Sequence, residues 1–213
     1  MNQIQWMKGE KEDRNLQNTW TRFLTGDQEA FAVLYNLHID HLYHYGIKLC
    51  HDDEAVKDSL QELFLELFLK REKIKVTPEN LKYYLLLALK RALVKKILSK
   101  RKNNHDLDQP IDFEPEYSIE FQIMERERDA EIDRKVSDAL NQLPTKQKEA
   151  VYLRFNAGLD YPEIAGILEI TVESVRKQVH RALKTVREIL GNDSHHLLFS
   201  IFFKKSQKNL SMF

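Results

Sequence analysis

Hydrophobic residues recur at intervals of three and four positions through residues 17–103 and again through residues 129–191. This is the spacing of amphipathic helices. The intervening residues 104–128 contain two prolines and many acidic residues, and they show no clear period. The pattern predicts two small helical domains joined by an acidic linker, with an N-terminal extension over residues 1–16 and an apolar, then basic, tail over residues 192–213.

The second helical domain carries local signals for where its helices begin and end. One helix is expected to run unbroken to Gly158, since glycine suits the position after a helix end. Asp160 and Glu163 have the spacing of a capping box at the start of the next helix. Thr171 is a natural N-cap for the last helix, and we expect Ile170 to be a buried residue of the turn before it.

Two short helices joined by such a tight turn make a helix-turn-helix. In the second of them, Val175, Val179, Leu183 and Val186 form an apolar stripe. The opposite face is polar and basic, and a recognition helix places such side chains in the major groove, where Arg and Lys contact guanine edges and phosphates. The candidate DNA-contacting residues are Thr171, Glu173, Ser174, Arg176, Lys177, His180, Arg181 and Lys184.

Composition favours an all-α protein. The 213 residues include only 6 glycines and 5 prolines, too few for the turns of a sandwich, a barrel or a doubly wound α/β fold. The glycines are scattered singly, which excludes a glycine-rich phosphate loop. Cys50 is the only cysteine, so neither an internal disulfide nor a cysteine zinc cluster is expected. With no signal peptide and no apolar run of membrane length, we expect a cytoplasmic protein.

The formal net charge is zero, which taken alone argues against binding to nucleic acid. The distribution of the charges argues the other way. Residues 105–133 carry eleven acidic and two basic residues, whereas residues 17–104 have a net charge of +4 and residues 134–191 have a net charge of +3. The total therefore hides two basic blocks separated by a strongly acidic one.

The stretch LPTKQKEAVYLRFNAGLDYPEIAGILEITVESVRKQVHRALKTVREIL combines a Leu-Pro opening, a Tyr-x-Glu-Ile-Ala segment and a Val-x-x-x-x-His-Arg-Ala segment. In these features it resembles region 4 of a bacterial RNA polymerase sigma factor of the extracytoplasmic-function (ECF) group. The resemblance implies that the recognition helix reads the −35 promoter element and that the domain touches the flap of the β subunit. The family often has glycine where this chain has Glu169, so a left-handed residue there would be mildly strained.

The first domain resembles region 2 of the same family over DDEAVKDSLQELFLELF and YYLLLALKRALVKKILSKRK. In the first of these stretches Asp58, Gln61 and Glu62 lie at i, i+3 and i+4, so they share one face of a helix opposite the Leu/Phe stripe. The resemblance implies that this face binds the clamp coiled coil of the β′ subunit of core RNA polymerase. An acidic, polar face suits an arginine-rich partner helix.

Seven basic residues and no acidic residue lie between Lys90 and Lys102, and Tyr83 and Tyr84 precede them. Aromatic rings beside cations suit single-stranded DNA, which offers bases for stacking and phosphates for ionic attraction. The resemblance implies that this helix meets the −10 element and that the loop of residues 73–80 captures a flipped base. The candidate residues are Lys73, Lys75, Asn80, Tyr83, Tyr84, Lys90, Arg91 and Lys95.

The resemblance as a whole implies a sigma factor, which binds core RNA polymerase and promoter DNA and helps to open the −10 region. It implies no enzymatic activity, cofactor or small-molecule substrate. Family members are often held inactive by a membrane-anchored anti-sigma factor, for which the apolar residues 197–203 are a candidate docking segment. The acidic linker either passes through the RNA exit path, as in the family, or serves simply as a solvated tether.

Two other functions stay open on the sequence alone. A stand-alone helix-turn-helix regulator would bind a palindromic site as a dimer, without polymerase. A helical adaptor would use its basic faces on acidic proteins and would have negligible affinity for DNA at physiological salt.

A histidine-rich stretch invites a metal-binding interpretation. His38, His41 and His44 recur every three residues, with Cys50-His51 nearby. This progression drifts around the helix, and no carboxylate or cysteine cluster completes a zinc ligand set. We therefore expect ordinary histidines and no metal site.

Overall fold

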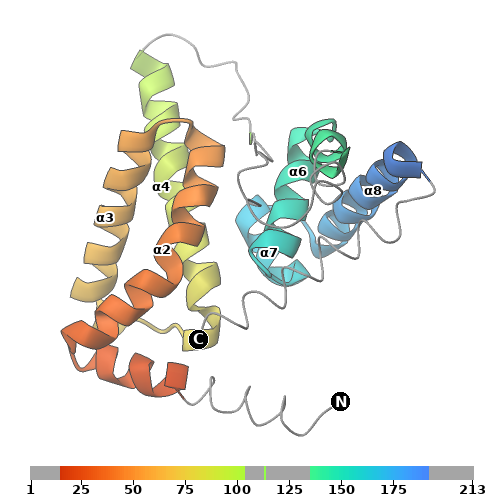
Figure 1. Cartoon of the computed structure of the whole chain (residues 1–213). Helices are drawn as coiled ribbons and strands as arrows, with labels where there is room; N and C mark the ends of the chain where they lie inside the picture. The colour runs from red at the N-terminus through yellow and green to blue at the C-terminus, as the bar shows by residue number, and fades with distance from the viewer. Residues whose placement is uncertain (1–14, 104–112, 114–134, 192–213) are drawn as a thin grey trace, which may run out of the picture. The chain divides into compact units, whose positions relative to one another are not determined.

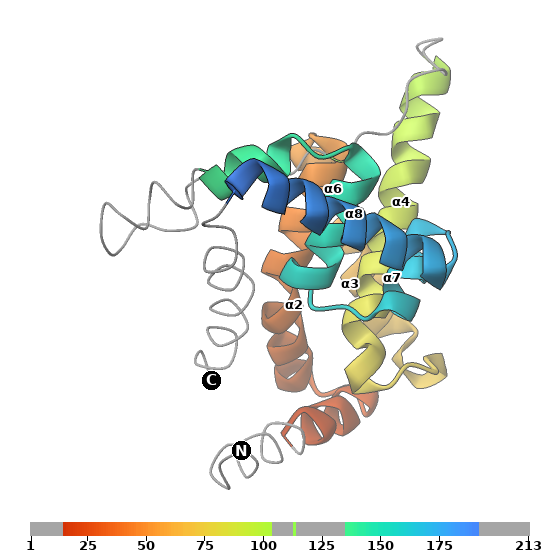
Figure 2. The ribbon, with the colours of Figure 1, turned by 90° about the vertical axis from the view of Figure 1, so that its right-hand side faces the viewer.

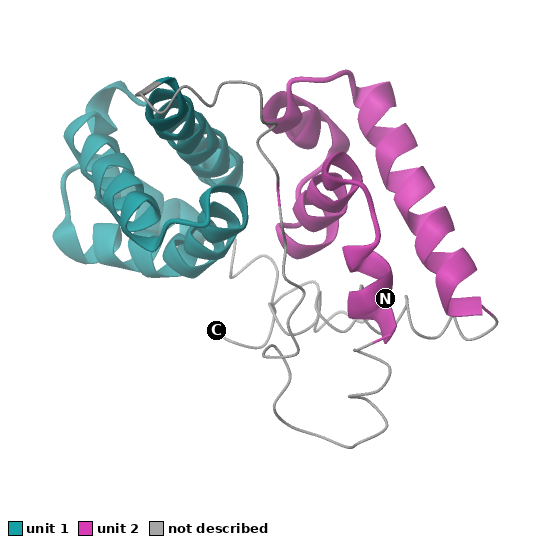
Figure 3. Cartoon of the chain, turned by 90° about the horizontal axis from the view of Figure 1, so that it is seen from above, with its two compact units in different colours: residues 1–110 teal, residues 111–213 magenta. Residues whose placement is uncertain are grey.

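The computed structural model describes residues 15–103, Phe113 and residues 135–191, and every regular element in these ranges is helical (Figure 1). The chain divides into two compact units, Met1–Pro110 and Ile111–Phe213 (Figure 3). The predicted all-α chain with two small helical domains is thereby confirmed. Within the described ranges, no helix is long and apolar enough to cross a membrane.

Unit 1 is built on three long helices that pack against one another (Figures 1 and 2). They are α2 (Gln28–Cys50), α3 (Asp53–Leu69) and α4 (Leu81–Asn103), and a helical segment over residues 15–24 precedes them. Two short 3-10 turns, η1 (Arg71–Lys73) and η2 (Pro78–Asn80), lie on either side of four non-helical residues between α3 and α4. Thr77 is extended and Pro78 begins η2, so no α-helix runs across this pair.

The first turn of α3 shows which of two aspartates caps it. The carboxylate of Asp52 accepts a hydrogen bond from the backbone N–H of Ala55 at 3.0 Å, so Asp52 is the N-cap. Asp53 instead accepts from the Tyr43 hydroxyl at 2.8 Å and from Lys57 at 2.7 Å. The first carboxylate satisfies a backbone donor that the helix leaves open, and the second links α3 to α2.

The core of unit 1 combines leucines with an aromatic cluster. Phe31 of α2 packs against Phe64 and Phe68 of α3, with ring centroids 6.3 and 5.1 Å apart. Helices α2 and α3 also approach closely at Gly46, where an added Cβ would lie only 2.7 Å from Cγ1 of Val56. Glycine at this position is therefore a packing requirement of the helix pair.

Unit 2 contains a helical segment over residues 135–141 and four labelled elements. These are α6 (Thr145–Val151), η4 (Tyr152–Asn156), α7 (Tyr161–Leu168) and α8 (Val172–Leu190). Its core joins the first segment, α6 and α8 through Val136, Ala139, Leu140, Leu143, Val151, Ala182 and Val186.

The expected unbroken helix up to Gly158 is wrong in one respect. After Val151 it widens into the π-helical turn η4, in which the Ala157 N–H donates to the Tyr152 carbonyl at 3.0 Å. The wider turn lets Tyr152, Leu153 and Ala157 all lie in the core. Such turns have no simple hydrophobic period, which is why the sequence pattern did not predict it. Gly158 follows with a φ of +73°, in the left-handed conformation that glycine tolerates.

The helix-turn-helix begins with the predicted caps. The backbone N–H of Glu163 donates to Asp160 and the backbone N–H of Asp160 donates to Glu163, both at 2.8 Å, which is a complete capping box. Thr171 caps α8 by accepting from the Ser174 N–H at 3.2 Å. These three cap residues were correctly predicted from the sequence.

The turn between α7 and α8 differs from expectation at Ile170. Its side chain is 37% exposed instead of buried, because Ile164 and Ile167 of α7 already fill the core beneath the turn. The expected strain at Glu169 is present, with φ 54° and ψ 41° in the left-handed region. Its N–H donates to the Ala165 carbonyl and closes the helix.

The histidine-rich stretch lies on α2. His38 is buried, and its Nε2 has no hydrogen-bond partner among the described residues. Burial, with smaller contributions from Lys82 and His41, lowers the pKa of His38 to about 4, so the side chain is neutral at physiological pH. In the described part of the chain, no three His, Cys, Asp or Glu side chains come together as metal ligands.

Replacing Glu169 with glycine is expected to raise the free energy of unfolding by about 0.5–1 kcal/mol. A left-handed conformation costs a non-glycine residue about 1–2 kcal/mol, and the greater backbone freedom that glycine loses on folding offsets about 0.5–1 kcal/mol of that gain. Urea unfolding of the full chain, followed by circular dichroism, measures the difference. Glu169→Ala keeps the Cβ and should bring no gain; a gain equal to that of Glu169→Gly would mean that removing the carboxylate is responsible.

Candidate functional site

The recognition helix α8 turns its apolar stripe inward and its polar residues outward. Val175, Val179, Ala182 and Val186 are buried, while Leu183, which was expected in the stripe, is only half-buried because Ala182 takes the inner position. The residues predicted to contact DNA lie on the opposite side. Thr171, Glu173, Arg176, Lys177, His180, Arg181 and Lys184 are exposed, and Ser174 is half-buried.

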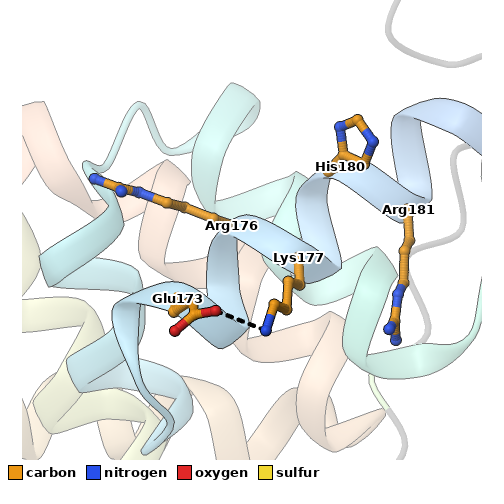
Figure 4. A pocket seen from close by; sticks show the side chains of 5 residues that line it. All are labelled: Glu173, Arg176, Lys177, His180 and Arg181. Carbon is orange, nitrogen blue, oxygen red and sulfur yellow. Dashed lines mark ion pairs between the residues drawn. The ribbon is translucent and has the colours of Figure 1, made fainter.

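Five of these side chains line an open surface hollow on α8 (Figure 4). They are Glu173, Arg176, Lys177, His180 and Arg181. In Figure 4 the side chains spread apart, with Arg176 extending away from Arg181 and with Lys177 directed to Glu173, to which it pairs at 2.7 Å. The surface is basic, with one carboxylate at its N-terminal end. Because the side chains point in different directions, they could contact different parts of a duplex.

Three of the predicted residues also hold the helix itself. Thr171 caps α8, and its hydroxyl lies 2.8 Å from that of Ser174. Near the C-terminal half, Lys184 pairs with Glu188 at 3.7 Å across one helical turn. The Thr171 contacts fix the start of α8. Surface ion pairs such as Lys184–Glu188 are weak enough to exchange for phosphate contacts.

Arg176 has an aromatic neighbour that the sequence analysis missed. Its guanidinium lies 5.7 Å from the ring centroid of Tyr161, and the guanidinium of Arg154 lies 5.0 Å from the same ring. Arg154 also donates to the Leu159 carbonyl at 2.8 Å. Tyr161 therefore sits between two cations and orients Arg176 at the edge of the hollow. No spacing rule in the sequence links these three positions, because they come from three different elements.

In unit 1, Asp58, Gln61 and Glu62 are all exposed on the outer face of α3, as predicted. Glu62 pairs with Lys96 of α4 at 3.4 Å, so it lies where this face borders the neighbouring helix. The structure adds Leu65 and Leu69, which follow Asp58 by seven and eleven positions on the same face and are 59% and 68% exposed. The sequence prediction for this face covered only its polar residues, so these two leucines were missed. Their spacing from Asp58 was the available signal.

The predicted −10 residues of α4 form two neighbouring stripes. Tyr84, Arg91 and Lys95 lie at i, i+7 and i+11 on one face, and Tyr83 and Lys90 lie at i and i+7 beside them. Arg91 and Lys95 are exposed, whereas Tyr83, Tyr84 and Lys90 are half-buried. The helix therefore presents aromatic rings near its start and cations further along.

The seven cations from Lys90 to Lys102 do not all face outward. Lys96 pairs with Glu62, and Lys100 pairs with Asp52 at 2.6 Å, so these two turn toward α3. The Lys100 hydrogen bond is the main cause of the lowered pKa of the Asp52 carboxyl. Lys96 and Lys100 therefore link α4 to α3, whereas Arg91 and Lys95 lie on the predicted DNA face.

The loop before α4 brings the remaining predicted residues to the surface. Lys73, Lys75 and Asn80 are exposed. Arg71 anchors the start of the loop by donating to the Phe68 carbonyl at 2.9 Å while its guanidinium lies 4.8 Å from the Phe68 ring centroid. The tail segment 197–203 and all linker residues other than Phe113 lie outside the described residues.

Comparison with known families identifies the second unit. Residues 133–186 match the family described as Sigma-70, region 4. This range contains α6, α7 and most of α8.

Two curated relatives extend the similarity over most of the chain. One is the ECF RNA polymerase sigma factor SigW of Bacillus subtilis (strain 168), 23% identical over 172 residues that cover 78% of this chain and 91% of SigW. The other is the RNA polymerase sigma factor CarQ of Myxococcus xanthus, 24% identical over 174 residues that cover 80% of this chain and 94% of CarQ.

Solved structures share the fold. The sigma factor RpoE from Bartonella quintana, in complex with the anti-sigma factor NepR, aligns with a TM-score of 0.53 at 21% identity over 76% of this chain and 98% of RpoE. CnrH, in complex with the cytosolic domain of CnrY, aligns with a TM-score of 0.50 at 18% identity over 82% of this chain and 96% of CnrH.

The region 4 match, the two relatives and the shared fold confirm the resemblance inferred from the sequence. Residues 133–186 therefore carry a sigma-70 region 4, and over most of its length the chain is similar to bacterial sigma factors, one of them of the extracytoplasmic-function group.

Proposed function

We propose that this protein binds core RNA polymerase, directs it to promoters through contacts with the −35 and −10 elements, and helps to separate the strands at the −10 element. The observation that carries the proposal is the segregation of surface chemistry onto three helices. An acidic and apolar face lies on α3, and basic faces lie on α4 and α8. This combination fits a protein that joins another protein to DNA.

The outer face of α3 is proposed to bind the β′ clamp coiled coil. Asp58 and Glu62 supply negative charge for basic side chains of a partner helix, and Gln61 supplies hydrogen bonds. Leu65 and Leu69 give the same face an exposed apolar end, which a partner would cover. Charge provides orientation in such an interface, and the apolar contact adds buried area.

The outer face of α4 and the loop before it are proposed to hold the −10 strand. Tyr83 and Tyr84 supply rings for base stacking, and Arg91 and Lys95 attract the phosphate backbone. A base extruded from the duplex would be taken up by the loop of residues 73–80, where stacking and hydrogen bonds offset the cost of unpairing. None of these steps requires a catalytic residue or a cofactor.

The recognition helix α8 is proposed to read the −35 duplex. Arg176, Lys177, His180 and Arg181 lie on its outward face, within reach of base edges and phosphates once the helix enters the major groove. The remaining part of unit 2 would touch the β flap. Because the two units are parts of one chain, each weak contact raises the local concentration of the other.

An anti-sigma factor is also proposed as a partner. RpoE and CnrH were solved in complex with NepR and CnrY respectively. A protein that covered the faces of α3 or α4 would block polymerase and −10 contacts together.

The function of a stand-alone regulator would explain fewer of the surface features than the sigma function does. It would use the basic face of α8 but would leave the exposed acidic and apolar face of α3 without a partner. The two functions differ in their need for polymerase.

Run-off transcription with bacterial core polymerase and a pool of random upstream DNA tests the proposal directly. Discrete start sites are expected only when this chain is added, and they should share −35 and −10 sequences. The stand-alone regulator is the better description if the chain binds specific DNA without core and neither co-elutes with core nor yields transcripts.

Charge reversal at Asp58 is expected to weaken binding to core polymerase by at least about tenfold, equivalent to about 1.4 kcal/mol, because a lysine there repels the basic partner helix. Competition with a labelled reference sigma factor measures the affinity. Asp40→Lys is the matched control, since it makes the same charge change at an exposed site on α2. Equal losses in both variants would show that net charge matters and the α3 face does not.

Removing the Arg176 side chain is expected to weaken holoenzyme binding to its −35 duplex by about 1–3 kcal/mol, or roughly 5- to 150-fold, if the guanidinium contacts a base edge. Lys146→Ala removes one positive charge from an exposed site on α6 and should have a much smaller effect. Both are measured at one fixed salt concentration, because phosphate contacts depend strongly on salt. An equal loss on a scrambled −35 sequence would reassign Arg176 to phosphate binding.

A further inference from the structure

Phe113 belongs to the linker in sequence but lies in the core of unit 2. It precedes the helical residues of that unit by more than twenty positions, yet its side chain is only 1% exposed. Its ring packs edge-on against that of Tyr152, with centroids 5.6 Å apart and planes inclined by 63°. This is a favourable geometry for two aromatic rings.

The partner ring is itself held in place. Tyr152 is the first residue of the π-helical turn η4 and is buried, and this burial raises the pKa of its hydroxyl. The wider turn places Tyr152 in the core together with Leu153 and Ala157. The buried linker residue Phe113 therefore packs directly against the first residue of the π-helical turn. Phe113 is also the only Phe, Tyr or Trp among residues 104–116.

We propose that Phe113 anchors the linker to unit 2 and so determines which promoter spacer lengths the protein accepts. This inference rests on the proposed sigma function. With Phe113 anchored, only residues 104–112 separate unit 1 from the anchor in the sequence, and residues 114–134 connect two points that both belong to unit 2. The length of this loop does not affect how far the two units can separate.

The change in reach is large. Ten residues from Asn103 to Phe113 span at most about 33–36 Å, whereas the 32 residues from Asn103 to Lys135 span at most about 105–115 Å. Effective concentration falls with about the −3/2 power of tether length, so the anchor raises it by roughly sixfold. Since one base pair advances a duplex by about 3.4 Å, a tether of ten residues restricts the separation of −35 and −10 contacts far more tightly than one of 32 residues.

The first test measures the distance between the units without polymerase. Spin labels at Asp40→Cys and Lys146→Cys, in a Cys50→Ser chain, report the inter-unit distance distribution by pulsed electron paramagnetic resonance. A twelve-residue Gly-Ser insertion after residue 108 should lengthen and broaden this distribution. The same insertion after residue 124 should leave it unchanged. Equal broadening by both insertions would overturn the anchor.

Substitution of Phe113 provides the matching comparison. In a Phe113→Ala chain, both insertions should broaden the distribution, whereas Phe113→Leu should retain most of the wild-type difference between them. Circular dichroism melts identify any variant in which unit 2 is unfolded. The two insertion variants keep Phe113 and Tyr152, so they test the anchor even if Phe113→Ala fails to fold.

The second test uses run-off transcription with holoenzyme on promoters whose spacers differ by single base pairs. Wild type and the insertion after residue 124 should share one narrow optimum. Phe113→Ala and the insertion after residue 108 should lose up to about sixfold activity at that optimum, in line with the lower effective concentration, and should accept more spacer lengths. Unchanged spacer selectivity in both would overturn the role of Phe113.

The two tests separate the inference from the function on which it rests. A position-dependent insertion effect on distance, with no promoter-dependent transcripts from wild type, would retain the anchor and reject the sigma function. Promoter-dependent transcripts with equal effects of the two insertions would retain the sigma function and reject the anchor.

Discussion

The packing of Val175, Val179 and Val186 into the core of unit 2 fixes the direction of every polar side chain on α8. Because the α-helix repeats every 3.6 residues, burial of one stripe turns the residues between its members toward solvent. The cations of α8 are therefore presented along one side of a preformed helix, so the helix backbone needs no further ordering to present them. The same constraint acts on α3 and α4, where burial of one stripe of leucines, such as Leu60 and Leu93, leaves charged residues on the opposite face.

A chain of zero net charge is suited to attract DNA when its acidic and basic residues occupy different regions. The acidic residues that are most abundant in the linker are separated in sequence from the two basic units. Within unit 1, Asp52 pairs with Lys100 of α4 and Glu62 pairs with Lys96. Arg91 and Lys95 lie on the other side of the helix and keep their charge exposed. Local potential at these faces, and not the sum over the chain, governs association with a polyanion.

Features that depend on local chemistry were predictable from the sequence, and features that depend on non-local packing were not. The caps at Asp160 and Thr171 follow from side chains that accept hydrogen bonds from backbone N–H groups a few residues away. The all-α fold and the face of each helix follow from period and composition. By contrast, the exposure of Ile170 depends on which neighbours already fill the core.

The contacts that sequence analysis missed are also non-local. Tyr161 meets Arg154 and Arg176 only after three elements have folded together. Likewise, Phe113 lies in a segment whose composition predicts a solvated linker, yet its ring packs against buried Tyr152 of the π-helical turn. A hydrophobic residue isolated among acidic ones carries no periodic signal, so its burial follows from the tertiary structure alone.

A tether contributes to bivalent binding only when its length matches the separation of the two sites. A connection as long as that from Asn103 to Lys135, without an anchor, would let the two basic units bind DNA almost independently, with little selection for spacing. Docking one aromatic residue shortens the effective tether without shortening the chain. The residues beyond Phe113 then retain their negative charge while the spacing between the units is set by the shorter segment. Under this arrangement, tether length and linker charge are separate properties that can change independently in sequence.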